Sequence, residues 1–307
     1  MKELYFTVEE SDEGKRLDVF LSNVFDKISR AKIQELINNN KVSVNQNFKK
    51  NSYKLKINDK IFVQFEEQEQ EIIICPQDIA LDIVYEDENM LVVNKPSGML
   101  THPTSTEKEN TLVNALLFKY GQNLSDINGE FRRGILHRLD RNTSGLLMVA
   151  KNNKAHEFLA NQIKEKTALR KYLTIAQGNF NTDTGIINLP TSRHPKFPHK
   201  RAVVEEGKPS ITEFSIIERF KGYTYLELTL KTGRTHQIRV HLSHIKHPII
   251  NDSLYGAAPF AVKTQEQVLQ AYKLIFTKPF SCEIIELEIE PDEKIKKVLG
   301  YLRSKKL

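Results

Sequence analysis

The spacing of apolar residues in the first 66 positions predicts two short helices followed by strands. A first helix is indicated by five apolar residues that recur at helical spacing: Leu17, Phe20, Leu21, Val24 and Phe25. Ser29 can cap a second helix, which the three asparagines at 38–40 would end. The apolar side of that helix would hold Ile33, Leu36 and Ile37. Residues 42–44 and 55–65 are typical of short strands, so residues 14–66 are expected to form a small α+β unit.

Beyond residue 80, apolar runs typical of strands alternate with helical patterns. The expected strands are 83–85, 90–93, 146–150, 171–176, 223–230 and 284–289, and the expected helices are 112–119, 154–166, 236–245 and 294–302. This order predicts an α+β domain around a mixed, largely antiparallel sheet. Residues 66–71 contain only glutamate and glutamine, the composition of a solvated connector. We therefore predict two domains, 1–70 including the linker and 71–307.

Composition and charge narrow the functional classes. The 307 residues carry 45 Lys and Arg against 39 Asp and Glu, a formal charge of +6 that favours a polyanionic partner. Cys75 and Cys282 form no C-x-x-C pair, so neither a thiolate zinc site nor a disulfide framework is expected. The chain has no glycine-rich nucleotide-binding loop and no apolar run near ~18 residues. The sequence therefore predicts a cytoplasmic protein without a membrane span or a nucleotide cofactor.

Basic charge is concentrated in residues 27–60, which hold nine Lys or Arg and two acidic residues. This stretch resembles the αL motif, a small RNA-binding domain shared by a small-subunit ribosomal protein and tyrosyl-tRNA synthetases. The matching residues are Arg16, Leu17, Asp18, Ser29, Arg30, Ile33, Val42, Val44, Asn45, Lys54 and Asp59. We predict RNA contacts through Arg30, Lys32 and Lys54; the alternative is a solvated basic face. Asn40 and Gln46 stand where the motif usually has glycine, and asparagine tolerates left-handed backbone better than most residues.

Residues 134–147 carry the most informative candidate chemistry. Their sequence, GILHRLDRNTSGLL, places Asp140 in a polar loop between Arg138 and Arg141, immediately before an apolar strand. Guanidinium groups beside a carboxylate favour its ionised form, so Asp140 would be available as a nucleophile or base. From local composition alone, a surface turn aspartate paired with arginine explains the pattern equally well.

This segment resembles the signature of the RluA-type pseudouridine synthases, G-I-V-H-R-L-D-x-x-T-S-G-L, with Leu136 in place of valine. Further matches to the family occur in the expected order along the chain. Two lie upstream of this segment, at 93–98 and 102–103, and four lie downstream, at 170–173, 233–242, 247–249 and 252–256. The resemblance implies the pseudouridine synthase fold. It also implies an isomerisation in which the glycosidic bond of a uridine in RNA is broken, the uracil rotates and its carbon 5 is joined to the ribose. No metal or organic cofactor takes part in the reaction so implied.

The resemblance assigns roles to individual residues. Asp140 would be the essential carboxylate, Arg239 its ion-pair partner, and Tyr172 the ring that stacks on the flipped uracil. Arg138 would fill the space that the base vacates, and Arg141 is a further candidate for RNA contact. The alternative interpretation is that Tyr172 is an ordinary tyrosine of the hydrophobic core. An ionised Asp140 is needed by three possible mechanisms: attack on ribose carbon 1, addition to the uracil ring, and removal of a ribose proton. The identity of the side chain therefore does not distinguish these mechanisms.

Four histidines and a basic loop outside this set are further candidates for function. Histidines 236, 241, 244 and 247 suggest a metal, but no Cys or acidic ligand lies nearby and Pro248 puts the last of them outside the expected helix, so no metal is predicted. Thr235 is expected to cap that helix. Residues 193–201 form a basic, proline-interrupted loop that suits phosphate contact about as well as simple exposure. Lys246 and Gln270 replace a glycine and a histidine that are usual in the family.

Taken together, the residues and the resemblance predict an RNA pseudouridine synthase that acts as a monomer on structured RNA. Large-subunit ribosomal RNA is the substrate implied by family analogy. The rival hypothesis is a non-catalytic RNA-binding or ribosome-assembly factor that retains the scaffold. Binding alone does not require Asp140, Tyr172 and Arg239 together, which favours the enzyme.

Overall fold

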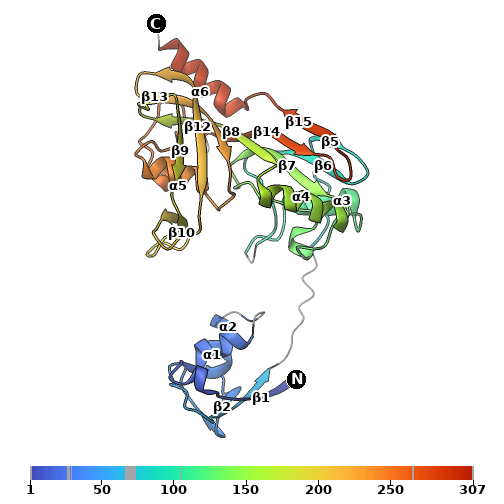
Figure 1. Ribbon diagram of the computed structural model, residues 1–307, viewed down its shortest axis with the longest axis vertical. Coiled ribbons are helices and arrows are strands. Elements are labelled where there is room, and N and C mark those ends of the chain that lie inside the picture. The colour runs from blue at the N-terminus through green and yellow to red at the C-terminus, as the bar shows by residue number, and fades with distance from the viewer. Residues whose placement is uncertain are drawn as a thin grey trace. The chain divides into compact units, whose positions relative to one another are not determined.

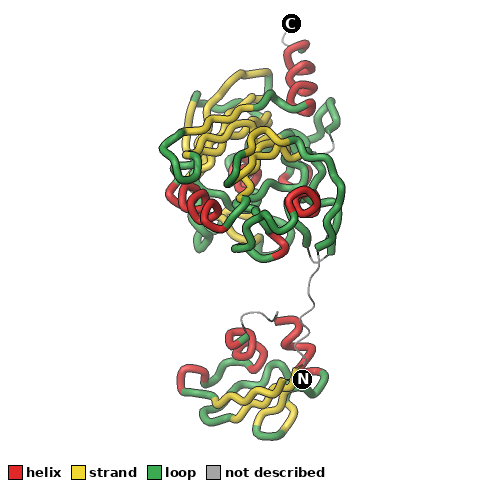
Figure 2. Tube along the Cα trace, turned by 90° about the vertical axis from the view of Figure 1, so that its right-hand side faces the viewer, coloured by secondary structure: helices red, strands yellow, loops and turns green. Residues whose placement is uncertain are grey.

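The computed structural model describes residues 2–25, 28, 30–65, 74–104, 106–264 and 266–305. The chain divides into two compact units, Met1–Ile72 and Ile73–Leu307 (Figure 1, Figure 2). Ser29 and the acidic run 66–71, expected to act as a helix cap and a linker, lie outside the described residues. Within the described ranges, no helix has the length and apolar character needed to cross a bilayer.

The first unit is a four-stranded sheet, in the order β1-β4-β2-β3, packed with two helices. Its elements are β1 (Lys2–Thr7), α1 (Leu17–Val24), α2 (Arg30–Asn38), β2 (Val42–Val44), β3 (Asn47–Phe48) and β4 (Lys60–Phe65). Both predicted helices are present, and their core residues include Leu17, Phe20, Leu21, Ile33 and Ile37. Val24, which shares the helical spacing of these residues, lies at the end of α1 and is 41% exposed.

Turns in this unit explain where the strand prediction failed. The strand expected over 55–65 begins only at Lys60, because Asn58 adopts a left-handed φ of 66° and the chain turns there. Asn40 and Gln46, the two residues in the places of glycine, have φ values of 57° and 64°. Both therefore adopt the left-handed conformation that glycine would otherwise supply. β1, which pairs with β4 along its whole length, was not predicted.

The second unit is built on a nine-stranded sheet in the order β5-β6-β7-β14-β8-β13-β12-β9, with β15 paired to β14. Its strands are β5 (Ile83–Glu86), β6 (Met90–Lys95), β7 (Ser144–Ala150), β8 (Leu169–Gln177), β9 (Thr184–Asn188), β12 (Ile211–Phe220), β13 (Tyr223–Leu230), β14 (Leu269–Thr277) and β15 (Ile284–Glu288). Among the described strands of this sheet, only β7 and β14 pair in parallel. The predicted α+β class with a mixed, largely antiparallel sheet is therefore confirmed.

Four helices accompany this sheet: α3 (Leu112–Tyr120), α4 (Asn153–Glu165), α5 (Gln237–His244) and α6 (Glu293–Ser304). β6 and β7 are buried on both faces, which explains their continuous apolar runs. Leu91 and Val93 of β6 pack in one core cluster with α3, whereas Met90 and Val92 pack in another with Leu159 of α4. In Figure 1, α4 lies along β7 and α5 lies beside β12.

Several strands of this unit were not predicted. The most important is β14, which joins the β7 side of the sheet to the β8 side. Residues 193–201, expected to form a basic, proline-interrupted loop, are the loop at the tip of a hairpin whose strands, β10 (Thr191–Arg193) and β11 (Arg201–Val203), were not predicted. Gln270, in the place of the usual histidine, is buried in β14 and bonds the backbone of Glu290 and Asp292. Lys246, in the place of the usual glycine, has a left-handed φ of 69°.

Candidate active site

Asp140 lies in the loop that leads into β7, and backbone contacts fix the loop on both sides of it. The hydroxyl of Thr101 donates to the carbonyl oxygen of Leu139 at 2.9 Å. After Asp140, the buried ammonium of Lys95 donates to three backbone carbonyl oxygens, those of Pro96, Met99 and Arg141. The Asp140 side chain is 17% exposed. The loop therefore holds a partly accessible carboxylate in a fixed place.

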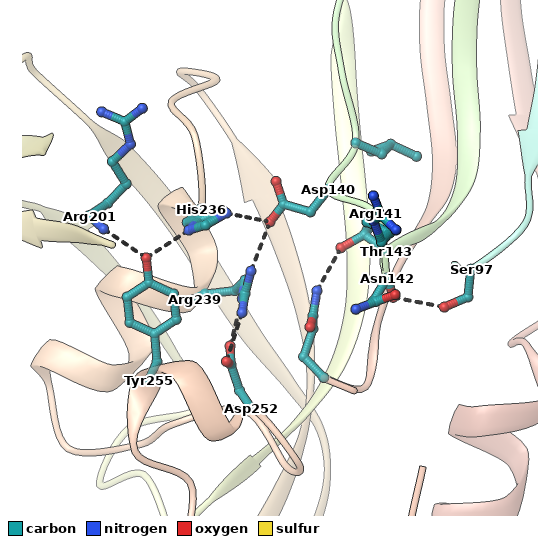
Figure 3. A network of polar contacts seen from close by, with 12 residues as sticks. Ser97, Asp140, Arg141, Asn142, Thr143, Arg201, His236, Arg239, Asp252 and Tyr255 are labelled. Carbon is teal, nitrogen blue, oxygen red and sulfur yellow. Dashed lines mark hydrogen bonds and ion pairs between the residues drawn. The ribbon is translucent and has the colours of Figure 1, made fainter. Parts of the chain in front are cut away.

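The cation that faces Asp140 is Arg239 of α5 (Figure 3). Its Nη1 donates to Asp140 Oδ2 at 3.3 Å, across 99 positions of sequence. Its Nε and Nη2 donate to the two carboxylate oxygens of Asp252, at 2.6 and 2.8 Å. Burial opposes the charge on Arg239, but its hydrogen bond with Asp252 and the charges of Asp252 and Asp140 outweigh burial and raise its pKa. Arg239 is thus a permanent cation shared by two carboxylates.

Tyr255 and His236 complete this network. The Arg239 guanidinium lies over the Tyr255 ring, 4.9 Å from its centroid. The Tyr255 hydroxyl accepts from the Arg201 backbone N–H at 3.0 Å and lies 2.8 Å from His236 Nδ1. The Nε2 atom of His236 lies 3.8 Å from Asp140 Oδ2. Burial, opposed by the Asp140 charge, lowers the His236 pKa, so the neutral imidazole faces the carboxylate.

The expected cap of α5 was wrong. The residue at the N-cap is His236, not Thr235, and no side chain caps the helix. His236 has a left-handed φ of 56°. This turn of the backbone brings the His236 ring close to Asp140, in a way that a helical pattern extended to 236 does not predict.

A cavity of about 560 Å³ opens beside Asp140 and is lined by Tyr172, Arg239 and His236 among other residues. Tyr172 lies on β8, where it is only 5% exposed and belongs to the main core cluster. Burial raises its pKa. Tyr172 is therefore both a core residue and a residue of the cavity wall: its ring is packed in the core and still borders the cavity.

A second hollow, of about 670 Å³, borders Asp140 on another side and is lined by Arg138, Arg141, His199 and Lys200. Arg138 is exposed. Arg141 forms an ion pair with Glu107 and donates to its carboxylate. The sequence suggested that the flanking arginines would hold Asp140 ionised, but among the described residues its ion-pair partner is Arg239, and the neutral His236 ring lies 3.8 Å away. The tip of the β10–β11 hairpin also borders this hollow through His199 and Lys200.

The histidines near α5 are held by the protein itself. His241 Nδ1 lies 2.9 Å from the Thr212 hydroxyl, and its Nε2 lies 2.9 Å from the Leu189 carbonyl oxygen. His247 Nδ1 lies 2.9 Å from the carbonyl oxygen of Gln177. Across the part of the chain that the structure describes, no cluster of three or more His, Cys, Asp or Glu could hold a metal ion.

In the first unit, the expected RNA-contact residues differ in how they are held. The buried carboxylate of Asp18 accepts from Arg16, Gln34 and Arg30, whose guanidinium contributes a contact of 2.8 Å. Arg30 remains 54% exposed. Lys54 is exposed, and Lys32 pairs with Glu35 at 2.8 Å. Arg30 thus combines a structural ion pair with an exposed guanidinium edge.

Sequence reasoning gave no role to Asp252 or Tyr255. The family match over 252–256 included both residues, but nothing in the local pattern shows that they surround Arg239. Asp252 is fully buried and Tyr255 follows it in a short helical turn, so both reach Arg239 only through the folded chain.

Comparisons with known proteins agree with this geometry. The profile of the family described as RNA pseudouridylate synthase matches residues 89–244, and that of the S4 domain matches residues 15–61. An uncharacterized RNA pseudouridine synthase of Bacillus subtilis is 40% identical over 99% of both chains. Ribosomal large subunit pseudouridine synthase D of Yersinia pestis is 43% identical, covering 84% of this chain and 78% of the relative.

Solved structures show the same fold. Human RNA pseudouridylate synthase domain containing 4 aligns with a TM-score of 0.57 at 20% identity, over 72% of this chain and 92% of the other. Human RNA pseudouridylate synthase domain containing 1 aligns with a TM-score of 0.54 at 24% identity, over 74% and 96%. The chain therefore belongs to the RNA pseudouridylate synthase family and carries an S4 domain at its N-terminal end.

Proposed function

We propose that this RNA pseudouridine synthase modifies uridine in large-subunit ribosomal RNA and that Asp140 is its essential carboxylate. The substrate follows from relatives named ribosomal large subunit pseudouridine synthase D, which are 37 to 43% identical. The observation that carries the role of Asp140 is its position: it borders both hollows and is paired with a buried arginine. The proposal includes action as a cytoplasmic monomer.

The target base has to leave its stack before Asp140 can reach it, and extrusion costs least in loops and bulges. A cavity of about 560 Å³ beside Asp140 is of a size that suits a small ligand or a single nucleotide. Tyr172 offers a ring at its wall, and stacking on an aromatic ring stabilises a base by about 1–3 kcal/mol. Arg138, exposed at the border of both hollows, is placed to occupy the space that the base leaves.

Within the site, Asp140 acts in its ionised form, and Arg239 stabilises that form while it orients the carboxylate. The neutral His236 ring lies beside the same oxygen, at 3.8 Å. In the S4 domain, Arg30, Lys32 and Lys54 dock the RNA through its phosphates. Arg141 contacts RNA at the border of the second hollow.

The test uses large-subunit ribosomal RNA tritiated at carbon 5 of uridine, because the isomerisation releases that tritium. The wild type is expected to release tritium and Asp140→Asn to release none, with the melting temperature unchanged. Asp183→Asn, an exposed carboxylate paired with Arg219, is the matched control and should behave as the wild type. Release by Asp140→Asn would remove the proposed role of Asp140. RNA binding without release by the wild type would instead favour a non-catalytic assembly factor.

A further inference from the structure

Arg170 is a buried guanidinium without an anionic partner. It lies on β8 two residues before Tyr172, so both side chains are on the same face of the strand. Arg170 is 5% exposed, and its Nε has no hydrogen-bond partner. Among the described residues it forms no ion pair, whereas Arg239 and Arg133, which are similarly buried, are each paired with a carboxylate. A buried arginine of this kind is expected to receive an anion from outside the chain.

His137 supplies a second unused donor at the same place. Its Nε2 accepts a hydrogen bond from the Met148 backbone N–H at 3.1 Å, so the neutral ring carries its hydrogen on Nδ1. Nδ1 is buried and has no partner. Burial and the charge of Arg170 lower the His137 pKa to about 3, which keeps the ring neutral.

Both groups line the cavity that Asp140 and Tyr172 also border. Other cations around that cavity include Lys164, Lys166 and Arg234, and Asp140 is the only acidic residue among those that line it. Gly233 leaves room for the guanidinium, because a Cβ there would lie 2.8 Å from Arg170 Nη1. The cavity wall formed by Arg170 and His137 therefore has the charge and the free donors of an anion site.

We propose that Arg170 and His137 form a subsite for a phosphate of the RNA backbone, the phosphodiester next to the extruded uridine. This inference rests on the proposed function, since it places the nucleotide in the cavity beside Asp140. A guanidinium matches the geometry of two phosphate oxygens, and the imidazole N–H adds a neutral donor. The uracil carbonyl oxygens could accept the same hydrogen bonds, but they would leave the buried charge without an anion.

Removal of the arginine gives opposite results for a binding role and a structural role. Arg170→Met should leave the melting temperature of the free protein unchanged or higher, because it removes a buried charge that has no partner. The same change should lower kcat/KM for tritium release by about 10- to 100-fold, the loss expected for a charge-assisted hydrogen bond. Lys171→Met, the neighbour paired with Glu227, is the matched control and should keep kcat/KM within about twofold. A lower melting temperature together with unchanged kcat/KM would overturn the proposal.

A second measurement identifies the ligand as phosphate and does not depend on turnover. RNA fragments carrying one neutral methylphosphonate on either side of the target uridine are titrated against Asp140→Asn, with and without Arg170→Met. On one side of the uridine, the neutral linkage should weaken binding of the RNA to Asp140→Asn. The variant that carries both Asp140→Asn and Arg170→Met should bind the neutral and the charged RNA with equal affinity. Equal losses in both proteins at both linkages would assign Arg170 to another group, such as the uracil, and reject the phosphate subsite. If the wild type released no tritium, only the proposed function would fail, because these titrations measure binding alone.

Discussion

Asp252 holds Arg239 by two hydrogen bonds, to Nε and Nη2, and so leaves Nη1 directed at Asp140. Asp252 is fully buried, and the Arg239 side chain is 7% exposed. The shorter contacts, 2.6 and 2.8 Å, are to Asp252, and the longer, 3.3 Å, is to Asp140. The carboxylate that fixes the arginine is therefore distinct from the one that would act on the substrate, which leaves Asp140 freer to move toward the ribose or the base.

Asp252→Asn should impair both folding and catalysis. An amide at position 252 can still accept one hydrogen bond but carries no charge, so among the described residues Arg239 keeps only Asp140, at 3.3 Å, as a carboxylate partner. Breaking a buried pair in this way costs about 3–5 kcal/mol of unfolding free energy. Arg239 would also lose its fixed orientation, so tritium release should fall more than tenfold. The measurements are thermal unfolding and kcat/KM.

Glu107→Gln is the control for that experiment, since it removes the exposed partner of Arg141, which is 42% exposed. An exposed pair contributes only about 0–1 kcal/mol. Similar losses in both variants would show that the buried pair has no special role.

Gly145→Ala should prevent the sheet from forming at the start of β7. Gly145 has a φ of 117°, and a Cβ on it would lie 2.0 Å from the carbonyl oxygen of Ala271, its partner on β14. The added Cβ is attached to one of two paired strands and the oxygen belongs to the other, so neither atom can move aside. We therefore expect a loss of about 3 kcal/mol or more of unfolding free energy, or no soluble protein. Gly222→Ala is the control: its φ of 80° is also left-handed, but no atom lies within 4 Å of the added Cβ. Equal stabilities of the two variants would contradict this account.

The sequence predicted the elements that carry their own signal, and most of the expected strands and helices of the second unit are present. The order of the sheet was not predicted, because β14 pairs with β7, β8 and β15 through contacts that local periodicity does not encode. β14 also places its Ala271 against both Gly145 and Tyr172. One of the strands missing from the prediction is thus the one that brings the Asp140 loop and the Tyr172 strand together.

In the candidate site, too, features that depend on tertiary contacts were not predicted from the local sequence pattern. The pairing of Asp140 with Arg239 was expected only from the resemblance to a family, since the residues are 99 positions apart and nothing in the sequence between them indicates the contact. The flanking arginines, which composition favoured, are not its ion-pair partners among the described residues. Asp252 and the left-handed His236 were missed because their effects depend on tertiary contacts and on one backbone dihedral.

Lys54→Gln should weaken RNA binding about equally for all sequences. An exposed lysine that neutralises one phosphate releases its counterions, so the slope of log Kd against log salt should fall by about 0.7 for single-stranded RNA. Lys221→Gln, in the exposed turn between β12 and β13, is the control for general loss of charge. Binding measured from low to high salt checks the result, and an unchanged slope would remove Lys54 from the RNA surface.

His102 should make the second unit less stable in mild acid. Burial, together with the charges of Arg138 and Arg132, lowers its pKa from 6.5 to about 4. Below pH 6.5 the unfolded chain binds a proton that the folded unit does not, so stability falls by about 1.4 kcal/mol per pH unit down to pH 4. Above pH 6.5 both states are neutral at this residue and its contribution is constant.

Amide hydrogen exchange of the β7 core measures this dependence within the intact chain. His102→Gln should reduce the slope between pH 6.5 and 5 by about 1.4 kcal/mol per unit. His199→Gln, at an exposed position at the tip of the β10–β11 hairpin, is the control for replacing a histidine elsewhere in the unit. The carboxylates titrate mainly below this range and so contribute little to it. If His102→Gln and the wild type gave parallel curves, His102 would not be the group that titrates on unfolding.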